Sequence, residues 1–373
     1  MEASTTEIGS GWRSLFGTLK AVHFPCYGIS APYDTNAATS AVNASHWQAV
    51  LDVFEAFLAT ENPQVFANAA LDYVTCLIHH VRGSEERQQL EELISIKEMD
   101  KFLVDNSTAD LTCSALQYLL QCHNILRRMH RMSACPVFQG AHRIHLAPVP
   151  ATVDSVVPDL DVKFFDATTE TLPEFPYSYR PLQTFGVGDE PLTSDDYASL
   201  MAVNNNHRGL LRVWYLLLDG LTSAVINCPR SYQAQAVDTL FDIFNSLLPR
   251  DPGARGEADG ENETDEEPLE VTDDGHELVH FGLYATNHLL LPMLQSWLRR
   301  SQRTFQGWQS SGPNFKHCMG KTTELVMKWL ALPRTEETEQ KINLVFKQLL
   351  LILIECTVVP VESIARLGCS CFR

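Results

Sequence analysis

The chain has 373 residues, 45% of them hydrophobic, which is enough apolar content for two ordinary domains or one elongated stack of helices. Its 46 acidic and 28 basic side chains give a formal net charge of −18, which argues against nucleic acid or an anionic lipid surface as the main partner. The ten cysteines form no CxxC pair and the first 20 residues contain no secretory signal, so reduced core thiols and a soluble cytoplasmic protein are expected.

The first 135 residues are predicted to form helical repeats. A first helix opens near Gly11. Apolar side chains between Val50 and Val81 recur at the i, i+3, i+4, i+7 spacing of a helix that faces a core, and Asn62-Pro63 divides this run into two helices. The expected building unit is therefore an antiparallel pair of helices.

Three other features are expected in the same region. A proline-containing loop is predicted from residues 24 to 45, and a charged helix is predicted around residues 85–93. A long helix should follow, with Ser107 or Thr108 as its N-cap, and it should end before Pro136.

The middle of the chain contains two segments with little helical periodicity. Residues 136–206 carry eight prolines and are predicted to be an irregular insertion with one short extended candidate at 160–165. Residues 207–249 then predict a helical hairpin that is broken at Cys228-Pro229. Residues 250–276 hold eleven acidic side chains and almost nothing to bury, which predicts a disordered acidic linker.

Residues 277–373 are predicted to form further helical repeats. The expected helices lie near 278–303, with a kink at Pro292, and at 315–332, 336–358 and from Val361 onward. No strict period is visible, but paired helices of this kind predict an all-α fold of the irregular armadillo- or HEAT-like solenoid type, with long loop insertions. The apolar face of the last helix is expected to need a successor that covers it.

The motifs of catalysis are missing from the sequence. The short glycine patterns at Gly9-Ser10-Gly11 and Gly186-Val187-Gly188 lack the flanking elements of a hydrolase or nucleotide site. His79-His80, and His142 with His145, have no matching cysteine or carboxylate cluster nearby. No catalytic, cofactor-binding or metal-binding residue is therefore expected, and no cofactor.

Basic clusters and one tryptophan are the candidates for an interaction surface. These residues are Arg127, Arg128, Arg131, Arg299, Arg300, Arg303 and Trp308. Both arginine clusters close the last turn of a predicted helix, where cations also stabilise the helix dipole, so a structural role competes with binding. Trp308 lies in a polar segment and is predicted to be a surface aromatic. Four other tryptophans lie among apolar residues and are expected in the core: Trp12, Trp214, Trp297 and Trp329.

Several long segments of the chain carry a family resemblance. They are the Gly11-Trp12 helix opening, VFEAFLATENPQVFANAALDYVTCL (53–77), VWYLLLDGLTSAVINCPR (213–230), FGLYATNHLLLPMLQSWLRRS (281–301), NFKHCMG (314–320) and ESIARLGCSCFR (362–373). These segments resemble the regions downstream of the catalytic domain in the large Arf guanine-nucleotide exchange factors. The blocks are spread from end to end of the chain, and strings such as ENPQVFANAA are far more specific than a short motif.

The resemblance implies a region of a large helical-repeat protein in Golgi and secretory-granule vesicle traffic. It implies protein partners, among them Arf-type GTPases or further copies of the full-length protein, and it allows peripheral membrane association. No segment resembles the exchange domain itself, so no catalytic residue can be carried over, and a regulatory or scaffold role is the expectation. Two alternatives stay open: a general adaptor-type helical-repeat module unrelated to Arf, and an enzyme with an unrecognised site.

Overall fold

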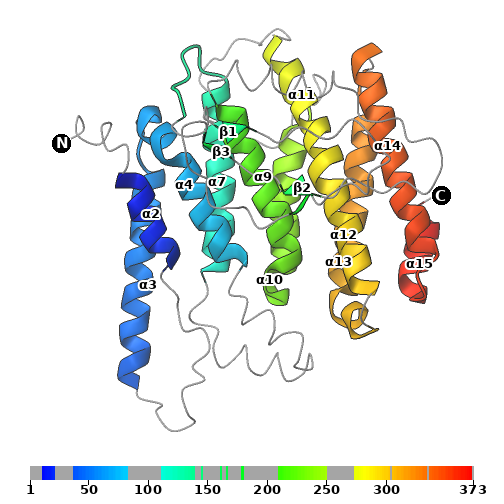
Figure 1. The fold of residues 1–373 in the computed structure, drawn as a ribbon, viewed down its shortest axis with the longest axis horizontal. Coiled ribbons are helices and arrows are strands. Elements are labelled where there is room, and N and C mark those ends of the chain that lie inside the picture. The colour runs from blue at the N-terminus through cyan, green and yellow to red at the C-terminus, as the bar shows by residue number, and fades with distance from the viewer. Residues whose placement is uncertain are drawn as a thin grey trace, which may run out of the picture.

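The helices stand side by side in a row, and this row runs along the longest axis of the molecule (Figure 1). The computed structural model describes residues 11–21, 37–82, 111–138, 209–249, 273–302, 305–333 and 336–371, together with four two-residue strands. The row runs from α2 (Gly11–Ala21) and α3 (Ala37–Leu58) at one end to α14 (Glu336–Thr357) and α15 (Glu362–Ser370) at the other (Figure 1). The predicted all-α fold class is confirmed, whereas the armadillo- or HEAT-like repeat pattern stays a prediction.

The start of α4 (Pro63–Arg82) follows from its local sequence. Proline fits the first turn of a helix because it has no N–H to leave unpaired and its φ is already helical. The Asn62 side chain accepts a hydrogen bond from the Gln64 backbone N–H at 3.0 Å, which satisfies one of the free donors of that turn. The predicted break at Asn62-Pro63 is therefore confirmed. α4 packs against α2, α7 (Thr112–His130) and α9 (Leu210–Asn227).

An aromatic cluster holds the N-terminal helices together. Phe16 from α2 lies edge-on to Phe57 at 5.4 Å and to Tyr73 at 5.1 Å, between ring centroids. The Tyr73 hydroxyl donates a hydrogen bond to the Phe54 carbonyl at 3.2 Å, so this buried ring also has a polar partner. Trp12 stacks on Phe16 at the half-buried edge of the cluster.

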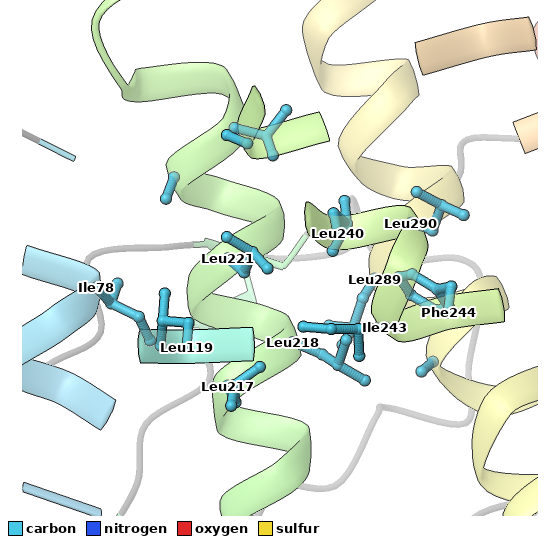
Figure 2. Packing of buried hydrophobic residues seen from close by; sticks show 14 of the residues in the cluster. Ile78, Leu119, Leu217, Leu218, Leu221, Leu240, Ile243, Phe244, Leu289 and Leu290 are labelled. Carbon is cyan, nitrogen blue, oxygen red and sulfur yellow. The ribbon is translucent and has the colours of Figure 1, made fainter. Parts of the chain in front are cut away.

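The central helix α9 (Leu210–Asn227) is buried on nearly every side. It packs against α4, α7, α10 (Arg230–Ser246), α12 (Leu291–Gln302) and the π-helical turn η3 (Thr286–Leu290). In Figure 2, its leucines point to Ile78 and Leu119 on one side and to Leu240, Ile243 and Phe244 on the other. α9 is the one described helix that is long and apolar enough to cross a membrane, but 83% of it is buried within the protein, as in a core helix.

A π-helical turn interrupts the helix where a kink was predicted. α10 (Arg230–Ser246) completes the hairpin with α9 after the break at Cys228-Pro229, as predicted. Beyond it, α11 (Asp273–Ala285), η3 (Thr286–Leu290) and α12 (Leu291–Gln302) form one continuous run. The Leu291 N–H bonds to the Thr286 carbonyl, five residues back, one residue before Pro292. The wider turn is thus placed beside the residue that cannot donate to the helix ladder.

Two helices begin earlier than predicted. α3 begins at Ala37, inside the expected loop, because this alanine-rich stretch favours a helix without carrying a bulky apolar stripe. α13 (Phe305–Leu330) begins ten residues before the predicted start at Phe315. Pro313 lies within the helix and is exposed.

Three other boundaries also differ or cannot be compared. α7 begins at Thr112 with Leu111 as its N-cap and no side-chain cap, so the predicted cap at Ser107 or Thr108 is wrong. The charged helix around 85–93 lies outside the described residues. α11 begins at Asp273, inside the predicted linker, and the linker up to residue 272 also lies outside them.

Four short strands occur in the predicted insertion. β1 (Ile144–His145) pairs antiparallel with β3 (Phe165–Asp166), and β2 (Leu160–Asp161) pairs antiparallel with β4 (Ser178–Tyr179). The rest of 139–208 lies outside the described residues. The proposed domain boundaries therefore stay predictions.

Candidate interaction site

The Arg299 side chain ties α12 to α14. Its Nε donates to the Glu355 carboxylate at 2.9 Å, and a second guanidinium nitrogen lies 3.5 Å from the other carboxylate oxygen. The Gln295 amide donates to the same carboxylate at 3.0 Å. Because Glu355 is only 8% exposed, these hydrogen bonds offset the cost of burying its charge. Arg299 is thus engaged between helices, and only part of it faces solvent.

Arg300 makes a separate contact to the end of α9. Its guanidinium donates to the Asn227 side-chain oxygen at 2.7 Å. This contact joins α12 to α9, and the Arg299 pair joins α12 to α14. Arg303, the third residue of the predicted cluster, lies outside the described residues.

The second predicted cluster lies at the C-terminal end of α7. Arg128 and Arg131 are exposed, and Arg127 is half-buried. Arg131 is the C-cap, where a cation stabilises the free carbonyls of the last turn. α9 and α10 lie between this cluster and α12, so the fold does not bring the two arginine clusters together (Figure 1).

The prediction that Trp308 is a surface aromatic is wrong. The side chain is 7% exposed and lies edge-on to Phe315 at 5.3 Å, while Phe315 also contacts Trp297 at 5.7 Å. Because α13 begins at Phe305, Trp308 and Phe315 are seven residues apart on one helix and share its core-facing side. Trp214, Trp297 and Trp329 are buried, as predicted.

A buried hydrogen-bond network joins α7, α9 and α10. It was not predicted from the sequence. The Trp214 indole N–H donates to His123 Nδ1 at 3.0 Å, and Ser246 Oγ lies 2.7 Å from His123 Nε2. Since Ser246 donates its hydrogen to the Ile243 carbonyl, Nε2 must be the protonated nitrogen. Burial, and secondarily the charge of Arg127, lowers the pKa of His123 to about 3, so the ring is neutral. Its role is structural.

Four other titratable side chains are buried and lie on four different elements: Cys76, Asp219, His288 and Cys318. Burial raises the pKa of Asp219, on α9, to about 7 and lowers that of His288, on η3, to about 3. Burial also raises the pKa of the Cys76 and Cys318 thiols to about 12, which disfavours the nucleophilic thiolate. The described residues contain no group of three or more His, Cys, Asp or Glu side chains that could hold a metal ion.

Comparison with known proteins identifies the relatives of the chain. Brefeldin A-inhibited guanine nucleotide-exchange protein 3 of Homo sapiens is 32% identical over 378 aligned positions, which cover 100% of this chain and 14% of the relative. The chain is related to a segment of that exchange protein. Brefeldin A-inhibited guanine nucleotide-exchange protein 3 of Mus musculus is 30% identical over 377 positions, with the same coverage.

The match confirms the resemblance seen in the sequence. The chain spans about a seventh of the length of brefeldin A-inhibited guanine nucleotide-exchange protein 3, and its predicted place after the catalytic domain stays a prediction. No family model matches the chain, and no solved structure matches it.

Proposed function

We propose that the chain acts as a non-catalytic regulatory or scaffold region of an Arf guanine-nucleotide exchange factor-like protein in Golgi and secretory-granule vesicle traffic. The observation that carries the proposal is the match of the whole chain to a protein named for guanine-nucleotide exchange. The match supports a relationship to that family, and the role within it is the proposal.

The arrangement of charged side chains supports a scaffold. Arg299 and Glu355 join α12 to α14, and Asp238 on α10 accepts from Lys321 on α13 at 2.9 Å and lies 2.8 Å from His317 Nε2. These contacts hold neighbouring helices in a fixed relation, which suits a surface that positions partners. Catalysis would instead require titratable groups to converge where a substrate can reach them, and Asp219, His123 and His288 are buried.

The partners proposed for this region are proteins. An Arf-type GTPase and further copies of the full-length protein are the two candidates, with peripheral association to Golgi or granule membranes. The net charge of −18 makes nucleic acid an unsuitable partner.

Release of a fluorescent GDP from an Arf-type GTPase tests the proposal that the chain is non-catalytic. The rate with the purified chain should equal the spontaneous rate, while an active exchange domain and EDTA serve as positive controls. Dose-dependent acceleration by the chain alone would contradict the proposal.

The distribution of the tagged chain in cells tests the proposed role in Golgi and secretory-granule vesicle traffic. Partial overlap with a Golgi or granule marker is expected. A uniform cytoplasmic distribution would favour the alternative, a general adaptor-type module unrelated to Arf.

A further inference from the structure

The outer face of α14 carries a second apolar row. Leu344, Lys347, Leu351, Ile354 and Val358 follow heptad spacing, and at 100° per residue they lie within about 80° of one another. Ile354 is 51% exposed and Val358, which directly follows the helix, is 75% exposed. Lys347 is exposed as well, and it is the one charged residue in the row.

The remaining sides of α14 are already covered. Its core side, which includes Val345, Leu349 and Ile352, is buried against α11, α12 and α13. α15 covers another side, where Gly368 approaches so closely that a Cβ would lie 2.8 Å from the Leu353 carbonyl oxygen. Leu344 and Leu351 are half-buried and lie outside the core cluster. An ordinary surface helix has one apolar stripe, and α14 has two.

We propose that this outer face of α14 is a docking surface for an amphipathic helix of a protein partner, with apolar residues at heptad spacing and an acidic residue opposite Lys347. The row is roughly 21 Å long, at 1.5 Å per residue, which matches four turns of a second helix. Heptad spacing suits side-by-side helix packing, in which each apolar side chain fits between those of the partner. A carboxylate opposite Lys347 keeps its ammonium paired when the row is covered.

A second copy of the chain fits this face less well. The row contains no carboxylate that could meet Lys347 of another copy, and the nearby Glu355 carboxylate is held by Arg299 and Gln295. Two chains that each carry a net charge of −18 also repel one another. The surface therefore selects a helix of different sequence, and the inference does not depend on the proposed role in Arf signalling.

Charge-swapped probe peptides test the proposal. The probes are fluorescent helical peptides with leucine at heptad positions and either Glu or Lys opposite Lys347, each made for the parallel and the antiparallel register. Fluorescence anisotropy should show that the wild-type chain binds a Glu peptide about tenfold more tightly than the matching Lys peptide. Lys347→Glu should reverse this preference, and Ile354→Asp should weaken binding of both peptides by at least about tenfold.

A matched control tests whether peptide binding depends on this face or on any exposed apolar residue. Met327 on α13 is 54% exposed and is not on the row, so Met327→Asp should leave peptide binding unchanged. Equal circular dichroism melts of the three variants would show that they fold alike. The proposal is overturned if no variant changes the Glu-to-Lys preference. It is also overturned if Ile354→Asp instead abolishes dimerisation in sedimentation or binding to anionic vesicles, which would assign the face to a second copy or to a membrane.

Discussion

The close approach of α9 to α4 at Gly220 yields a sharp prediction for Gly220→Ala. A Cβ at this position would lie 2.1 Å from Ile78 Cδ1 and 2.9 Å from Ile78 Cγ1. Replacing a helical glycine by alanine ordinarily stabilises by about 1 kcal/mol, whereas overpacking a core costs about 1–3 kcal/mol. Ile78 is buried and three of its carbons lie within 3.1 Å, so rotation of one methyl group does not relieve the overlap. We expect a net destabilisation of up to about 2 kcal/mol.

A double-mutant cycle with Ile78→Val identifies the cause. Ile78→Val alone should cost about 1 kcal/mol because it leaves a small cavity, but it also removes the Cδ1 atom nearest to the new methyl group. The double variant should therefore be more stable than the sum of the two single effects by about 1 kcal/mol. Urea unfolding followed by circular dichroism measures each free energy of unfolding.

Gly320→Ala in α13 is the matched control. Nothing lies within 4 Å of a Cβ at Gly320, so this change should stabilise the protein by about 0.5–1 kcal/mol. A stabilising Gly220→Ala, or strict additivity in the cycle with Ile78→Val, would refute the packing argument.

Three other variants test the polar contacts of the core. His123→Leu leaves the Trp214 indole N–H without its acceptor and should cost about 1–3 kcal/mol in urea unfolding; an unchanged midpoint would contradict this. The pKa of Asp219 in the folded protein is about 7, which lies above its ordinary value of 3.8. The contribution of Asp219 to folding stability is therefore fully present below about pH 4 and is lost as the pH rises through about 7. Thermal melts of Asp219→Asn should show a smaller fall in stability over this window, and an equal fall would exclude Asp219 as its source. Arg299→Lys should weaken the contact with Glu355 by about 1 kcal/mol, because an ammonium cannot pair with both carboxylate oxygens in the geometry of a guanidinium; equal urea midpoints would count against it.

Helix positions were predictable wherever local chemistry decides them. Asn62-Pro63 and Cys228-Pro229 end one helix and begin the next because proline cannot continue a hydrogen-bonded ladder, and the structure has breaks at both points. The apolar spacing in 210–225 likewise predicted the helix that became α9. The start of α3 at Ala37 was missed because alanine favours helix without marking which side faces the core.

The candidate residues were predictable as residue types, and their partners were not. The sequence by itself determined that Arg299 and Arg300 close an amphipathic helix. Only the tertiary structure decided that Arg299 meets Glu355, which lies 56 residues away, and that Arg300 meets Asn227. Likewise, Trp308 has polar neighbours in sequence but packs on Phe315. His123 forms hydrogen bonds with Trp214 and Ser246, which lie on two other helices. Spacing along the chain fixes which side chains share a helix face, whereas the packing of helices distant in sequence decides which of those faces are covered.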